Sequence, residues 1–145
     1  MKYKTEKDES SGLLRITALI AIPRFGVKVG DKGGLIEKES NLSHDGDAWV
    51  SGNAQVSGNA QVCGDARVSK TQHILTVGPI GSCNRTLTLF RTLEGCLIHT
   101  GCFVGDLDAF EEAVKKKPEG DIHRISYEAF LVGLRAYAAT LHVSP

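Results

Sequence analysis

Small and aliphatic residues recur every six positions through residues 46–69, which read GDAWVS GNAQVS GNAQVC GDARVS. Val50, Val56, Val62 and Val68 follow this period, and an alanine precedes each valine by two positions. Because side chains alternate between the two faces of a strand, each alanine shares a face with its valine. The glycine and the Asp or Asn that open each unit favour turns. The pattern predicts short strands joined by corners, with the valines and alanines facing the interior.

The six-residue step continues on both sides of these units. Ile36 and Leu42 keep the phase before them if the segment LSHDGDAW is a longer side with a small protrusion. Ile74 and Ile80 keep the phase after them. The repeat is therefore expected to occupy residues 36–80.

This repeat resembles the hexapeptide repeat of left-handed parallel β-helices, in which three hexads form one triangular coil. The resemblance implies an α+β, mainly β, fold: a short left-handed parallel β-helix capped by an N-terminal strand and by a C-terminal β-hairpin plus two helices. Its left-handedness comes from the resemblance alone, because parallel crossovers are otherwise right-handed. So few coils bury little apolar surface, so caps and self-association are expected to complete the fold. The resemblance favours a trimer.

The segments around the repeat show strand and helix patterns that would cover its ends. Alternating apolar residues over 14–22 predict a strand that stops at Pro23, and TLTLFRT-LEG-CLIHT predicts a hairpin. Asp106 is a suitable N-cap for a helix with one apolar stripe. A final helix, about 122–141, is apolar over a wide arc and is expected to contact both its own module and another subunit. The predicted divisions are a disordered N-terminus (1–12), an N-terminal strand and cap (13–35), the repeat (36–80) and a C-terminal capping and oligomerisation module (81–145).

Charge and composition exclude some classes of function. The chain has 17 basic and 17 acidic residues, so it lacks the basic excess that general nucleic-acid binding requires. It has no apolar run of about 20 residues that could cross a bilayer and no apolar N-terminal leader. We expect a protein of the cytoplasm that binds no membrane. The four cysteines contain no C-x-x-C pair, so free thiols are expected.

A metal site is not expected. The spacing Cys96-x2-His99-x2-Cys102 looks like a metal-binding cluster, but in a strand His99 would face away from the two cysteines. No cofactor is predicted either.

The segment TVGPIGSCNRTLTLFRT is the most suggestive place for a ligand. A Gly-x-x-Gly-Ser loop offers backbone N–H groups and a hydroxyl, and arginines can grip phosphate or carboxylate with two hydrogen bonds. The loop is not a P-loop, because it lacks the Gly-Lys-Ser/Thr ending. The competing interpretation is a tight connection flanked by solvated arginines. The candidate ligand-binding residues are Gly78, Gly81, Ser82, Arg85, Arg91 and His99.

Two residues raise the alternative of catalysis. The repeat resembles that of hexapeptide-repeat acyltransferases, which use a histidine near a coil corner as a general base, and His44 lies in the protruding side. Its neighbour Asp45 would orient it poorly, and a solvated turn residue is the competing interpretation. Cys63 could act as a nucleophile if its thiol were activated, but it replaces the serine of neighbouring hexads and fits a conservative corner variant better.

Four segments together resemble a set of small proteins encoded in bacteriophages and prophages: RITALIAIPRFGVKVGDKGGLIE, GDAWVSGNAQVSGNAQV, LTVGPIGSCNRTLTLFRT and TGCFVGDLDAFEEAV. The final helix departs most from that set. The resemblance implies a non-enzymatic, oligomeric binding protein of phage origin that counters host defence in the bacterial cytoplasm. Its ligand would be a nucleotide-like anionic signal, or it would block a host defence protein. The alternatives are an acyltransferase-like enzyme that uses His44 and a structural phage component.

Overall fold

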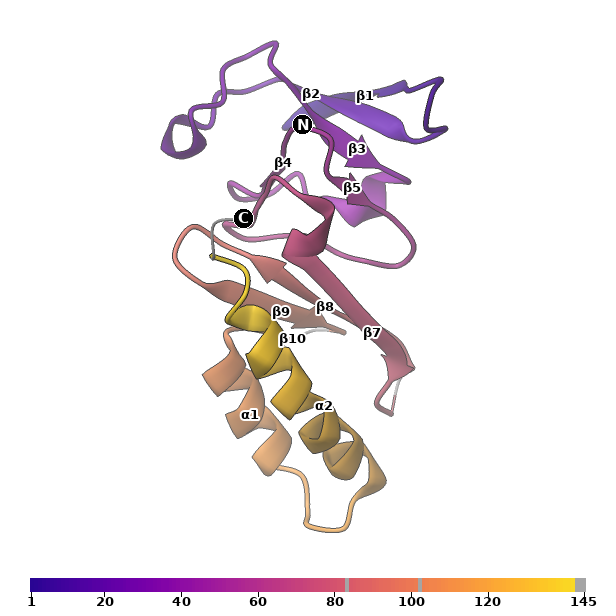
Figure 1. The fold of residues 1–145 in the computed structure, drawn as a ribbon, viewed down its shortest axis with the longest axis vertical. Coiled ribbons are helices and arrows are strands. Elements are labelled where there is room, and N and C mark those ends of the chain that lie inside the picture. The colour runs from indigo at the N-terminus through magenta and orange to yellow at the C-terminus, as the bar shows by residue number, and fades with distance from the viewer. Residues whose placement is uncertain (83, 102, 143–145) are drawn as a thin grey trace.

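The computed structural model describes residues 1–82, 84–101 and 103–142. Figure 1 shows three layers: the N-terminal strands at the top, a second sheet in the middle and the helices below it. The upper sheet has the order β1-β2-β3-β5, and the middle sheet the order β10-β9-β8-β7. The strands are β1 (Tyr3–Lys7), β2 (Leu14–Ala18), β3 (Lys32–Ile36), β4 (Trp49–Val50), β5 (Gln55–Val56), β6 (Arg67–Val68), β7 (Ile74–Ile80), β8 (Arg85–Arg91), β9 (Cys96–Thr100) and β10 (Phe103–Gly105), and the helices are α1 (Leu107–Lys115) and α2 (Ile122–Ala138).

The prediction of a left-handed parallel β-helix is wrong. Among the described residues the strands form separate small sheets, one mixed, one antiparallel and one two-stranded pair of β4 with β6, and no solenoid sheet. The parallel pairings within the repeat are short, because each hexad contributes at most two residues to a ladder. The upper sheet is mixed because β3 pairs with β2 in the antiparallel sense and with β5 in the parallel sense. The pairing with β2 occupies the edge of β3 that a further parallel coil would need. The trimer expected from the β-helix resemblance loses its support.

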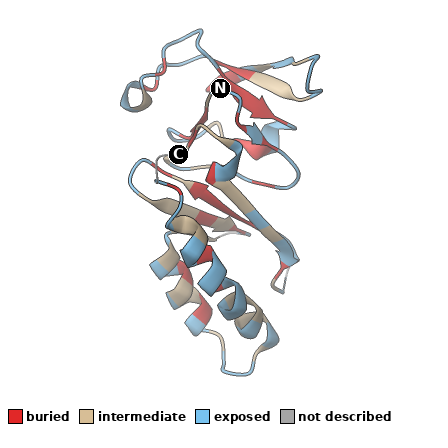
Figure 2. Ribbon diagram, in the orientation of Figure 1, coloured by how far each residue is buried: buried red, intermediate tan, exposed pale blue. Residues whose placement is uncertain are grey.

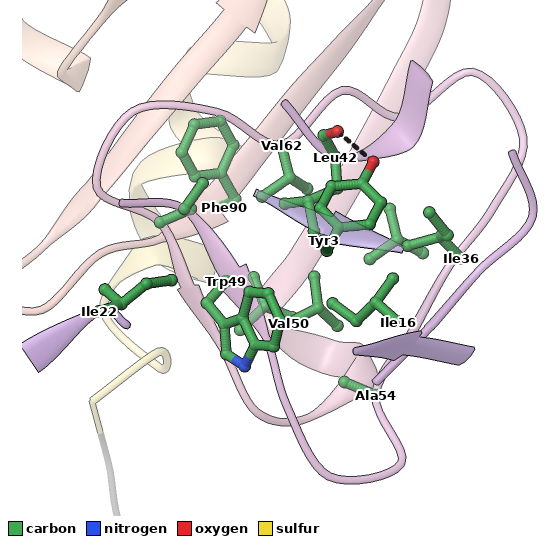
Figure 3. Packing of buried hydrophobic residues seen from close by; sticks show 14 of the residues in the cluster. Tyr3, Ile16, Ile22, Ile36, Leu42, Trp49, Val50, Ala54, Val62 and Phe90 are labelled. Atoms are coloured by element: carbon green, nitrogen blue, oxygen red, sulfur yellow. Dashed lines mark hydrogen bonds between the residues drawn. The ribbon is translucent and has the colours of Figure 1, made fainter. Parts of the chain in front are cut away.

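The predicted facing of the hexads is confirmed. Val50, Val56, Val62 and Val68 are at most 1% exposed, and they share one core with the alanines of the same units. Figure 2 shows the buried positions along the upper strands in red, and Figure 3 shows side chains of this core at close range. Each corner begins with a glycine whose φ is 62 to 69°, a conformation that a Cβ would strain. The six-residue period therefore correctly predicted which side chains are buried, although the sheets around them differ from those expected.

The N-terminus, expected to be disordered over residues 1–12, carries the edge strand β1. Tyr3 is fully buried, and its hydroxyl donates a hydrogen bond to the Leu42 carbonyl at 2.7 Å (Figure 3). Lys2 is 1% exposed, and its ammonium donates to the carbonyls of Gly46 and Ala48. A polar segment is ordered here because its polar atoms reach partners more than thirty residues away in the sequence.

The middle sheet separates two cores. Phe90 faces the hexads, whereas Leu87, Leu89 and Ile98 pack with the helices. The hairpin predicted over residues 86–100 is confirmed by the antiparallel pairing of β8 with β9. The boundary expected between residues 80 and 81 falls in the turn of the β7–β8 hairpin.

Both helices begin at an aspartate N-cap. The Asp106 carboxylate accepts from the Ala109 N–H at 2.8 Å, which confirms the predicted start of α1. The Asp121 carboxylate accepts from the N–H groups of His123 and Arg124, and α2 ends at Ala138 rather than near residue 141. Within the described parts of the chain, no helix has the length and apolar character needed to cross a membrane.

Candidate functional site

The turn between β7 and β8 positions most of the candidate ligand-binding residues. Gly81 has a φ of +83°, and its carbonyl accepts from the Asn84 N–H at 3.2 Å. The peptide bond between Gly78 and Pro79 is cis. Tyr127 of α2 lies so close to Gly81 that any side chain there would overlap the phenol. The turn is therefore held between its own backbone bonds and α2.

A polar cleft lies between this turn and the repeat. It encloses about 310 Å³. Its cations are Lys38, which precedes the short turn at Glu39–Asn41, and Arg85, the first residue of β8. None of the described residues that line it is acidic. The lining residues are Lys38, Ser40, Asn59, Gln61, Pro79, Asn84, Arg85, Thr86 and Gly101.

The two cations of the polar cleft differ in their partners. The Lys38 ammonium donates to the Asn59 side-chain oxygen at 3.1 Å. The Arg85 guanidinium makes no hydrogen bond or ion pair with any residue that the structure describes, and the residue is exposed. A guanidinium with its donors free is suited to bind a phosphate or a carboxylate.

An apolar cavity of about 250 Å³ adjoins the polar cleft on the side of the helices. Phe110 makes edge-to-face contacts with Phe103, at 5.6 Å between ring centroids, and with Tyr127, at 5.4 Å. These three aromatic residues line the cavity, with Ser82 and Lys117 among the polar residues. Arg85 and Gly101 line both the cavity and the cleft, so an apolar and a polar compartment meet at Arg85.

A third groove, of about 540 Å³, runs between the β7–β8 turn and the start of α2. Gly78 and Gly81 line it, together with Ile122 and Phe130. Four of the candidate residues, Gly78, Gly81, Ser82 and Arg85, are thus brought together around one turn.

Arg91 and His99 lie apart from this turn. Arg91 is at the other end of β8, where its Nε donates to the Arg67 carbonyl at 2.9 Å and its Nη2 to the Ser69 hydroxyl at 3.3 Å. Burial, with the nearby charge of Arg67, lowers the pKa of Arg91. Arg91 therefore ties the end of the repeat to the middle sheet. His99 pairs with the buried Thr88 across β8 and β9, and burial lowers its pKa.

His44 is neither a solvated turn residue nor well placed as a general base. Its ring stacks on Tyr3 with centroids 4.0 Å apart, and its Nδ1 accepts from the Lys2 backbone N–H at 3.1 Å. Because Nδ1 accepts, the neutral ring carries its proton on Nε2. That Nε2 is buried, has no hydrogen-bond partner among the described residues, and lies 3.9 Å from a Glu39 carboxylate oxygen. No ring nitrogen is left to take a proton from a substrate.

The cysteines do not form a reactive or metal-binding group in the part of the chain that is described. Cys63 and Cys96 are half-buried free thiols, and burial raises the pKa of both. A raised pKa keeps a thiol protonated and poorly nucleophilic. Cys83 and Cys102 lie outside the described residues, as does the part of the Cys96–His99–Cys102 pattern that rests on Cys102. No group of three potential metal ligands occurs among the residues described.

Lys38, Asn59 and Gln61 also line the polar cleft, although they were not predicted from the sequence. Asn59 and Gln61 occupy outward positions of a hexad whose Ala60 and Val62 are buried. The period of six could have placed both side chains outside the core. Only the tertiary fold brings them to the β7–β8 turn.

Comparisons with known proteins add no identity: no family model, curated protein or solved structure matches the chain.

Proposed function

We propose that this protein is a non-enzymatic binding protein for a small anionic ligand that carries an aromatic or apolar group, with a nucleotide as the best fit. The observation that carries the proposal is the position of Arg85, whose guanidinium has no partner among the described residues and lies where the polar cleft and the apolar cavity meet. Ligand sites of this kind combine apolar and aromatic walls with a few polar groups that fix orientation.

Each compartment suits one part of a nucleotide. Arg85 and Lys38 supply positive charge for a phosphate, and no acidic side chain among the described lining residues opposes it. The amides of Asn59 and Gln61 and the hydroxyl of Ser40 offer donors and acceptors for a sugar. Phe103, Phe110 and Tyr127 offer apolar surface for a base.

The biological setting that we propose rests on the resemblance to phage-encoded proteins. A protein that binds a nucleotide signal without converting it lowers the free concentration of that signal. For a phage this would counter a host defence that depends on the signal. Catalysis by His44 is a weaker alternative, because Nδ1 is occupied by a backbone N–H bond.

Thermal unfolding with a panel of compounds tests the proposal. The panel contains mononucleotides, cyclic dinucleotides, inorganic phosphate and an uncharged nucleoside. A ligand at 100 times its dissociation constant stabilises the folded state by about 2.7 kcal/mol. We expect a nucleotide to raise the unfolding temperature and the nucleoside to do so far less. The nucleotide recovered after incubation with the protein should be chemically unchanged.

Matched variants locate the site. Arg85→Ala should abolish the shift, because it removes the guanidinium that we propose binds the phosphate. Lys28→Ala, which removes an exposed cation elsewhere, should leave the shift unchanged. An equal shift in Arg85→Ala, or no shift with any anion of the panel, would contradict the proposal.

A further inference from the structure

Helix α2 has two apolar faces, only one of which is covered. Leu131 and Leu134 are at most 5% exposed and pack in the core that α2 shares with α1 and the middle sheet. On the other side, Ile122 is 70% exposed, Ile125 55% and Val132 76%. Figure 2 shows pale blue, exposed positions along the whole of α2. Monomeric proteins rarely leave large aliphatic side chains aligned in water, and such patches mark interaction sites.

The exposed apolar residues of α2 follow a coiled-coil spacing. They alternate at intervals of three and four residues, the period that keeps a seam facing a partner helix. The side chains opposite this seam, Tyr127 and Leu134, are the ones that pack inside the subunit. We define the α2 stripe as Ile122, Ile125, Ala129, Val132, Ala136 and Ala139, all of them exposed.

We propose that the α2 stripe binds the α2 stripe of a second copy of this chain, with the two helices antiparallel around a twofold axis. In this register each layer joins a branched residue to an alanine: Ile122 with the partner's Ala139, Ile125 with the partner's Ala136, and Val132 with the partner's Ala129. The stripe is thus complementary to itself when one helix is reversed. When every layer pairs one large residue with one small residue, the side chains interdigitate and the two helices can stay at a constant distance from each other.

Parallel pairing does not give this match. It would pair every residue of the stripe with its own copy, so that layers of two isoleucines, two valines and two alanines would follow one another and the distance between the helices would have to vary along the pair. Isologous twofold contacts are also the commonest form of self-association.

The charges beside the stripe favour the same orientation. Glu128 and Arg135 lie on one flank of α2, one heptad apart. In the antiparallel arrangement Glu128 faces the partner's Arg135, and symmetry repeats the pair. A parallel arrangement would instead set Glu128 beside a glycine. Within the subunit both residues already make exposed ion pairs, Glu128 with Arg124 and Arg135 with Asp108, so the new contacts would extend an existing network.

Sedimentation across micromolar concentrations tests the proposal, using the whole chain. We expect a dimer, and we expect Val132→Asp to raise the dissociation constant by about 100-fold or more, because the new carboxylate would be buried against the partner. Val132 is exposed in the single chain, so the variant should fold, and circular dichroism checks this. The control is Val29→Asp, which changes another valine that is 66% exposed but lies far from α2 in the sequence. A monomeric wild type, a larger assembly, or a dimer unaffected by Val132→Asp overturns the proposal.

Disulfide cross-linking tests the register. Chains with Ile125→Cys and chains with Ala136→Cys should form a mixed disulfide dimer when they are combined under mild oxidation. Neither variant alone should cross-link more than the wild type, whose native cysteines provide the background. Efficient cross-linking of Ile125→Cys with itself would indicate parallel helices and would overturn the antiparallel pair. These outcomes do not depend on ligand binding, because Arg85 is not part of the stripe.

Discussion

Asn41 and His73 perform the same task at two separate turns of the chain. The side-chain oxygen of Asn41 accepts from the backbone N–H groups three and four residues before it, at 2.9 and 3.1 Å. The Nδ1 atom of His73 accepts from the N–H groups three and four residues before it, both at 3.1 Å. Each residue ends a short 3₁₀ turn that begins after a lysine. His73 can do this only while Nδ1 carries no proton.

The protein should therefore lose stability in mild acid because of His73. Burial, followed by the charge of Arg91, lowers the pKa of His73 from 6.5 to about 4. Between these two values the unfolded chain binds a proton that the folded chain does not, so stability falls as the pH drops from about 6.5 to 4. Urea unfolding at pH 7 and pH 5 measures the loss. His73→Asn keeps an acceptor and removes the titration, so its loss should be smaller; the same loss in both proteins would contradict the assignment.

Part of the fold could be predicted because its signals are local. The six-residue period identified the buried valines, the aspartate before an amphipathic stripe identified the start of α1, and a glycine turn identified the β8–β9 hairpin. The sheets could not be predicted in the same way, because the hexads give the face that is buried but not the strand that pairs with each edge. The N-terminal segment contains mostly polar residues, and its order depends on Tyr3 reaching Leu42.

The candidate site, too, could be predicted from the sequence only in part. Gly81 lies in the β7–β8 turn and Arg85 directly follows that turn as the first residue of β8, so a Gly-rich loop followed by an arginine predicted both residues from the sequence. Arg91 belongs to the same stretch of sequence but lies a whole strand away, where it binds Arg67 and Ser69. Because β8 is extended, its two ends lie far apart, and of these two arginines Arg85 is the one that lines the cleft.

Loss of the Lys2 side chain should destabilise the protein more than loss of its neighbour Lys4. The Lys2 ammonium donates to the carbonyls of Gly46 and Ala48, which would be left without that donor, whereas Lys4 is exposed. Lys2→Ala should cost about 1–3 kcal/mol, the range for an unsatisfied buried polar group. Urea unfolding measures this cost, and Lys4→Ala should stay within about 0.5 kcal/mol of the wild type. Equal losses would show that Lys2 is not anchored in the interior.

Adjacent substitutions in one hexad test the facing of the repeat. Val56→Asp should prevent folding, because an unpaired charge in the interior costs several kcal/mol and Val56 is 1% exposed. Gln55→Glu changes an exposed side chain and should be nearly silent. Circular dichroism and soluble yield compare the two variants. Similar damage from both would mean that the assigned faces are wrong.

A methyl group at Gly81 should distort the β7–β8 turn. Gly81 has a φ of +83°, and a Cβ built on it would overlap the Tyr127 hydroxyl and lie 2.9 Å from the Tyr127 ring carbon that carries it. Gly120, between the helices, is the matched control: its φ is +85°, but nothing lies within 4 Å of a Cβ there. Gly120→Ala should thus cost only the backbone strain, about 1–3 kcal/mol, and Gly81→Ala should cost more.

The difference between the two variants should depend on Tyr127. A double-mutant cycle with Tyr127→Phe separates the overlap from the backbone strain, because the overlapping hydroxyl is removed while the ring stays. We expect Gly81→Ala to cost less in the Tyr127→Phe background than in the wild type, as measured by urea unfolding. Arg85 directly follows this turn, so Gly81→Ala should also weaken nucleotide binding, whereas Gly120→Ala should not. Identical costs for the two glycine variants in both backgrounds would show that Tyr127 does not press on the turn.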